Sequence, residues 1–273
     1  MSSIMRTHKL RTTPACLVVL GLAVLGLTNA YGVGAGTASA APTITMKARA
    51  VPIPGYRHTG NILGAGAALQ AEFTISGTEY GGFPAPLIGV KFYGPASAKL
   101  HPQGFATCSP TVIETKGPGP CPKKSQAGPK GSASGVVSFG TERVHETVSV
   151  QPFFAPGGNL EFFVDGTTPV SIEILSKGHV VGSSPPFGPT VNAEVPLVES
   201  VPGALDASTE RINVTTGAAY KKGKKLVSYI TVPKKCPKGG FPLKTVMEFG
   251  NVNNPKEPGE KAEATYKAPC PKK

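Results

Sequence analysis

Short segments in which apolar and polar residues alternate run through most of this chain. In residues 68–76, ALQAEFTIS, every second residue from Leu69 to Ile75 is apolar, which is the period-two pattern of a half-buried strand. The segments 160–165, LEFFVD, and 170–175, VSIEIL, repeat this pattern. Because no segment carries a sustained apolar stripe at helical spacing, the chain is predicted to be all-β.

Turn residues separate these segments along the whole chain, which contains 34 Gly and 28 Pro. About a dozen short strands divided in this way favour an immunoglobulin-like β-sandwich, built either as one large sandwich or as two packed ones. The KKGKK at 221–225 has a central glycine and is predicted to form a hairpin turn between the strands at 211–215 and 226–232. The other expected strands are 43–50, 87–93, 135–140, 144–150, 191–198, 244–250 and 262–268.

One short helix is expected near residues 109–116. Ser109 is a suitable N-cap, Pro110 suits the first helical position, and Gly117 can end the helix. The SSPPFGP at 183–189 resembles a linker. It predicts a β-sandwich domain over 41–187 and a basic C-terminal β domain over 188–273, either separate from the first or sharing a sheet with it.

The first forty residues have the features of a secretory signal peptide. Three basic residues precede an uncharged apolar run from Ala15 to Leu27, and the small residues ending at Ala40 suit signal peptidase. Cleavage after Ala30 and retention as a membrane anchor are the alternatives, although the apolar run is shorter than the ~20 residues that a bilayer requires. We therefore expect an extracellular or cell-wall-associated protein with no membrane contact after cleavage.

Cleavage leaves four cysteines, an even number that predicts two disulfides in an exported chain. These are Cys108, Cys121, Cys236 and Cys270. Pairing between sequence neighbours closes the shortest loops, so Cys108–Cys121 and Cys236–Cys270 are the expected bonds.

Positive charge is concentrated at the C-terminal end. Residues 41–216 carry equal numbers of basic and acidic side chains, whereas residues 217–273 carry 13 Lys and 4 Glu. Such a block can attract an anionic surface, and cell-wall polymers are the expected partner; the alternative is that the lysines only solubilise turns. The candidate polyanion-binding residues are Lys221, Lys222, Lys224, Lys225, Lys234, Lys235 and Lys238.

Two stretches resemble a known group of sequences. They are CSPTVIETKGPGPCPKKSQAG at 108–128, with its Cys-Ser and Cys-Pro-x-x-Ser elements, and YKKGKKLVSYITVPKKCPKGGFP at 220–242. Both are similar to segments of uncharacterised exported β-rich proteins of high-GC Gram-positive bacteria. The resemblance implies export and an all-β structure, and it implies no reaction, ligand or site residue.

Several chemistries lack the residue spacing that they require. The cysteines and histidines do not show paired metal-ligand spacing, so no metal and no cofactor is expected. The GAAYKKGKK at 217–225 has Lys225 where a phosphate-binding loop places Ser or Thr. Aromatic residues in the basic block are spaced like core residues, so nucleic-acid binding is not expected.

A non-catalytic binding or structural role at the cell surface is therefore the preferred function. The alternative is a secreted hydrolase whose site is assembled from separate strands. Glu142 and Glu146 would share one face of a strand, but they would lie about 13 Å apart, beyond the spacing of a glycosidase pair. They are expected to be solvent-facing charges, and a hydrolase would need two or more side chains to converge among Glu142, Glu146, His101, His145 and His179.

Overall fold

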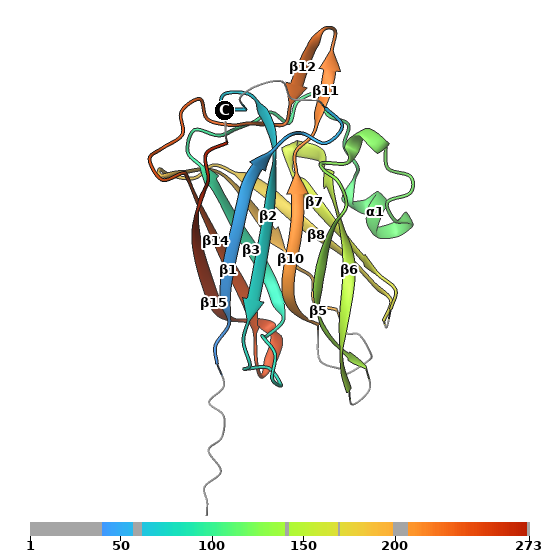
Figure 1. Ribbon diagram of the computed structural model, residues 1–273. Helices are drawn as coiled ribbons and strands as arrows, with labels where there is room; N and C mark the ends of the chain where they lie inside the picture. The colour runs from blue at the N-terminus through green and yellow to red at the C-terminus, as the bar shows by residue number, and fades with distance from the viewer. Residues whose placement is uncertain (1–39, 57–61, 140–141, 169, 199–206, 272–273) are drawn as a thin grey trace, which may run out of the picture. The chain divides into compact units, whose positions relative to one another are not determined.

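Antiparallel strands account for most of the chain, as the computed structural model in Figure 1 shows. It describes residues 40–56, 62–139, 142–168, 170–198 and 207–271, all of which belong to one compact unit, Ala38–Lys273. Thirteen strands form one large sheet, and two more form a separate hairpin. Within these residues no helix is long and apolar enough to cross a lipid bilayer.

The strands of the large sheet vary from two to fifteen residues in length. Their bounds are β1 (Thr43–Val51), β2 (Gly66–Ser76), β3 (Leu87–Pro95), β4 (Lys99–Leu100), β5 (Gly131–Phe139), β6 (Glu142–Phe154), β7 (Leu160–Gly166), β8 (Ile172–Val181), β9 (Phe187–Glu194), β10 (Ser208–Thr216), β13 (Ile230–Thr231), β14 (Phe241–Asn251) and β15 (Asn254–Ala268). The hairpin consists of β11 (Ala219–Lys222) and β12 (Lys225–Ser228), and 3₁₀ turns occupy Lys123–Ser125 and Pro156–Gly158.

The large sheet curls around an interior. Its order is β15-β14-β3-β9-β8-β7-β6-β5-β10-β2-β13-β4, and β1 pairs with β2. Although β1 and β15 lie at opposite ends of the chain, they contact each other across the sheet's two margins. The inner side of the sheet is therefore enclosed by strands, and the predicted all-β, sandwich-like architecture is confirmed.

The main core lies where β1, β2, β3, β14 and β15 come together. Met247 and Phe249 of β14 are fully buried there, and Phe73 of β2 packs edge-on against Phe92 of β3 at 6.3 Å. On β1, buried and exposed side chains alternate strictly from Thr43 to Lys47, as a strand with one face toward the core requires.

Several strands differ in extent from the sequence-based expectation. The strand expected at 191–198 begins earlier, at Phe187, and β6 and β15 are much longer than the expected 144–150 and 262–268. In β15 the added residues include Pro258 and Gly259, which are residue types that usually interrupt strands. In the structure they lie where the pairing with β14 shifts register near Gly250, an irregularity that long strands accommodate.

The hairpin expected at 221–225 forms, but between different strands. Lys222 and Lys225 pair across a turn with Gly223 at φ 61°, where a residue without a Cβ is favoured. The expected partners were 211–215 and 226–232. Instead β10 continues into the large sheet, and the second segment is divided at Tyr229, so that β12 belongs to the hairpin and β13 to the sheet.

Strands from both predicted parts of the chain alternate in the sheet. From the part after residue 187, β9 lies between β3 and β8, β10 lies between β5 and β2, and β14 pairs with β3. The two parts therefore contribute to one continuous sheet.

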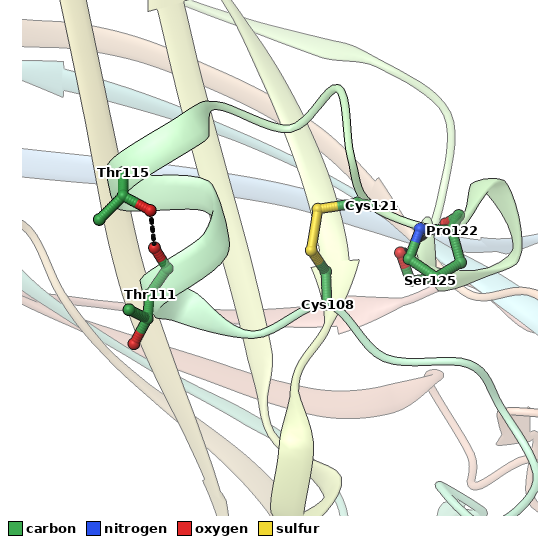
Figure 2. The surroundings of a disulfide bond; sticks show 6 residues. All are labelled: Cys108, Thr111, Thr115, Cys121, Pro122 and Ser125. Atoms are coloured by element: carbon green, nitrogen blue, oxygen red, sulfur yellow. Dashed lines mark hydrogen bonds between the residues drawn. A yellow bond between two sulfur atoms is a disulfide. The ribbon is translucent and has the colours of Figure 1, made fainter.

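Both predicted disulfides are present, Cys108–Cys121 and Cys236–Cys270. Figure 2 shows the first of them, which joins the two ends of the segment that contains α1 (Pro110–Lys116). Gly117 ends this helix as expected, with its N–H donating to the Ile113 carbonyl at 2.9 Å. Ser109 occupies the N-cap position, but its side chain makes no capping hydrogen bond.

Candidate functional site

An apolar cavity of about 310 Å³ lies inside the curled sheet. Each of the thirteen strands of the sheet contributes at least one residue to its lining. Inward positions follow the period of two: Glu146, Val148 and Val150 line it from β6, and Leu160, Phe162 and Val164 line it from β7. No Lys, Arg or His occurs among the described residues that line it.

Small residues at inward positions explain why the interior is not filled. Ala71 of β2, Ala133 and Gly135 of β5, and Ala193 of β9 all line the cavity. An added Cβ at Gly135 would collide with the backbone carbonyl of Ser208, so this glycine also permits close approach of β5 and β10. Bulky side chains at these positions would occupy the space that the cavity now provides.

Glu146 brings a carboxyl group into this apolar environment. Its side chain is 5% exposed, and neither carboxylate oxygen has a hydrogen-bond partner. Burial raises the pKa of Glu146 above its usual value, and the interaction of the carboxyl with the backbone N–H of Val170 offsets part of this shift. The expectation of a solvent-facing charge is wrong for this residue, because Glu146 shares the inward face of β6 with Val148 and Val150.

The local backbone makes room for this carboxyl. Gly166 ends β7 beside it, and a Cβ at this position would lie 2.7 Å from Oε1 of Glu146. Register places Glu146 opposite Gly135 of β5, which in turn pairs with Thr209 of β10. The nearby Ser208 hydroxyl, also without a hydrogen-bond partner, lies in the same part of the lining.

Tyr229 supplies a second polar group at the other end of the cavity. It is 1% exposed, and its hydroxyl has no hydrogen-bond partner. Burial raises the pKa of this phenol. Its ring is held by Phe154 at 4.7 Å and by Phe105 at 5.9 Å between centroids. Tyr229 falls within the strand expected at 226–232, where no sequence pattern distinguishes it from a core residue.

The other candidate catalytic residues lie away from the cavity. Glu142 is exposed at the start of β6, and His145 points outward, 3.3 Å from the carboxylate of Glu210. His101 is hydrogen-bonded to the Thr231 hydroxyl at 3.1 Å, and His179 is exposed on β8. Of the five residues considered for a hydrolase, Glu146 alone lines the cavity. The described residues contain no group of three or more His, Cys, Asp or Glu arranged to hold a metal ion.

The candidate polyanion-binding lysines all have exposed side chains. Lys221, Lys222, Lys224 and Lys225 flank the turn of the β11–β12 hairpin, which projects from the end of the sheet in Figure 1. Lys234, Lys235 and Lys238 lie in the segment between β13 and β14, which the Cys236–Cys270 disulfide joins to the residues after β15. No ion pair with a carboxylate is found for these seven lysines within the described part of the chain.

A second buried carboxylate lies on the outer side of the sheet, beneath the α1 segment. Glu161 of β7 is 1% exposed and faces Lys177 of β8 across the register. Lys177 instead forms an ion pair with Glu114 of α1, with 2.6 Å between Lys177 Nζ and Glu114 Oε1. Burial raises the pKa of Glu161 to about 7, Lys177 opposes this shift, and Glu114 adds to it.

This outer site is packed rather than open. Ile113 of α1 and Cys108 pack against Phe153, Phe163 and Leu175, which come from three neighbouring strands. The α1 segment therefore covers the outer surface of β6, β7 and β8, on the opposite side of the sheet from the cavity. No protein-family model, curated protein or solved structure matches this chain.

Proposed function

We propose that this chain is an exported, non-catalytic β-sandwich protein that binds an apolar ligand in its internal cavity. The observation that carries the proposal is the apolar space of about 310 Å³ to which every strand of the sheet contributes. This volume is within the range of small-molecule sites, which are concave and mostly apolar with a few polar groups. Glu146, Ser208 and Tyr229 are such groups here.

The energetic cost of an empty cavity supports a ligand. At about 24 cal/mol per Å³ of core cavity, a closed and empty space of this size would cost on the order of 7 kcal/mol. That is comparable to the net stability of a whole domain, which is about 5–15 kcal/mol. Because most of the lining is apolar, water is a poor filling for this space away from its few polar groups. Filling it with an apolar ligand recovers the lost contacts, so binding is the function that best accounts for it.

Export is the second part of the proposal. The signal-peptide pattern of residues 1–40 supports it, although these residues lie almost entirely outside the described range. The two disulfides are compatible with an extracellular location, since such bonds persist in oxidising compartments. A protein released in this way would carry an apolar compound through water, shielded by the sheet.

Blocking the cavity is expected to abolish binding without unfolding the protein. Ala133 lines the cavity between Val148 and Ile212, whereas its neighbour Ser132 is exposed on the opposite face of β5. In Ala133→Leu the added carbons occupy ligand space, and we expect affinity for the neutral probe N-phenyl-1-naphthylamine to fall at least about tenfold, which is 1.4 kcal/mol.

Ser132→Leu is the matched control, because the same side chain is added to the same strand on the other face. Fluorescence titration measures both affinities, and thermal unfolding establishes that both variants fold. Equal binding by the two variants at the wild-type level would contradict the proposal.

The lysine-rich end supports a further contact with anionic cell-wall polymer. Seven exposed lysines without carboxylate partners, four of them on one projecting hairpin, give this end an uncompensated positive charge. Such charges attract a polyanion over the Debye length, about 8–10 Å at physiological ionic strength.

Retention on a dextran sulfate column tests this contact. Neutralising the hairpin lysines at 221, 222, 224 and 225 with glutamine is expected to lower the eluting salt concentration clearly, because the charges removed are adjacent. The control removes the same number of charges from exposed lysines elsewhere, at 47, 116, 124 and 130. Identical elution of the two variants would show that only net charge matters.

A further inference from the structure

The unpartnered carboxyl of Glu146 indicates what kind of ligand the cavity takes, provided that the proposed cavity-binding function holds. A buried polar group without a hydrogen bond is unfavourable, and native structures normally supply a partner from protein or water. No described protein group lies in hydrogen-bonding geometry with either oxygen of the Glu146 carboxyl, although the backbone N–H of Val170 partly offsets the effect of burial on its pKa. A ligand group placed at this carboxyl would supply the missing hydrogen bond.

The position of Glu146 gives the ligand a direction. Glu146 lies near the start of β6, and Phe154, which contacts Tyr229, lies at the end of the same strand. They are eight residue steps apart along the strand, which corresponds to roughly 26 Å. The hydrocarbon depth of one membrane leaflet is about 15 Å, half the thickness of a bilayer core. The interior between Glu146 and Tyr229 is therefore long enough for an extended lipid chain. A volume of about 310 Å³ spread over that length leaves a narrow space.

The charges of the lining residues limit which polar head group a ligand can carry. Because no described lining residue is basic, an anionic head would have no counter-ion and would face a carboxyl group. A cationic head would require the burial of an ion pair, whose desolvation cost often exceeds the attraction gained. A hydroxyl group avoids both problems, since it can donate to a carboxylate oxygen or accept from a protonated carboxyl.

We propose that the cavity binds a single-chain lipid with a neutral hydroxyl head, hydrogen-bonded to the Glu146 carboxyl, with its chain extending toward Tyr229. This arrangement places one polar group of the ligand against one unpartnered polar group of the protein. The remaining lining, which includes Leu160, Phe162, Val164 and Val191, contacts the hydrocarbon chain.

Competition with bound N-phenyl-1-naphthylamine tests the head group, with dodecan-1-ol, dodecane, dodecanoate and dodecylammonium as competitors. For wild type we expect the alcohol to bind at least about tenfold more tightly than the carboxylate or the ammonium compound. In Glu146→Leu the preference for alcohol over alkane is expected to fall at least about tenfold, whereas Glu146→Gln, which still forms hydrogen bonds, should keep most of it. Glu142→Gln, exposed on the same strand, is the matched control and should leave the preference unchanged.

The outcomes separate the head-group assignment from cavity binding itself. If Glu146→Leu retains the wild-type preference, or if wild type binds dodecanoate or dodecylammonium more tightly than the alcohol, the hydroxyl assignment is wrong and cavity binding stands. If neither the probe nor any of the four compounds binds, both proposals are wrong. Thermal unfolding of each variant verifies that the measured losses come from a folded protein.

Discussion

Replacing Cys236 and Cys270 together with alanine is expected to lower the free energy of unfolding by about 4 kcal/mol. The bond closes a loop of 34 residues, and the entropy of a closed loop of that length in the unfolded chain accounts for this magnitude. The bond also holds the end of β15, the strand that contacts β1 where the two margins of the sheet meet. Urea unfolding measures the loss.

The double variant Cys108→Ala/Cys121→Ala is the matched control for this prediction. Its shorter loop of 13 residues predicts a loss of about 3 kcal/mol. Amide hydrogen exchange distinguishes the two bonds by location: β15 amides should lose protection only when the 236–270 bond is removed. Unchanged exchange in β15, or a stability loss below about 1 kcal/mol, would show that this bond does not hold the margin.

Glu161 is expected to make the protein less stable as pH rises from acid to neutral. Its pKa in the folded protein is about 7 because of burial, against an ordinary value of 4.5. The folded state therefore binds the proton more tightly than the unfolded chain does. The stability associated with that proton is complete below pH 4.5, is lost between pH 4.5 and 7, and is absent above pH 7. This difference in pKa corresponds to about 3 kcal/mol of folding free energy. Solvent does little to screen the charge, because Glu161 is 1% exposed.

Glu161→Gln removes this titration and keeps the shape of the side chain. The stability of the Gln variant relative to wild type should increase by about 3 kcal/mol between pH 4 and pH 8, measured by urea unfolding at each pH. Glu173→Gln, an exposed residue on the same outer face, is the control and should show no such increase. A constant difference between Glu161→Gln and wild type across this range would contradict the account of Glu161.

Local sequence patterns predict the strands well, because alternation reports directly which residues of a strand are buried. The segment LEFFVD shows this: its alternate residues Leu160, Phe162 and Val164 all face the interior. The helix α1 follows from the local signals of Pro110 at its start and Gly117 at its end, and the cysteine pairing follows from pairing sequence neighbours.

The cavity was not predictable in the same way. Alternation indicates that Ala71 faces inward, but whether a small inward residue meets a larger partner or leaves space depends on strands far away in sequence. Glu146 shows the same limitation, because its charge suggested solvent and only the alternation of Val148 and Val150 indicated the interior. A charged residue in register with buried valines was the available signal.

The most direct test of ligand binding in the interior is a crystal structure of the protein with 12-bromododecan-1-ol, located by the anomalous signal of bromine. We expect a bromine site inside the curled sheet, on the Tyr229 side of the cavity, with continuous ligand density toward Glu146. Bromine found only on the outer surface of the sheet, with an interior free of ligand density at saturating concentration, would contradict it.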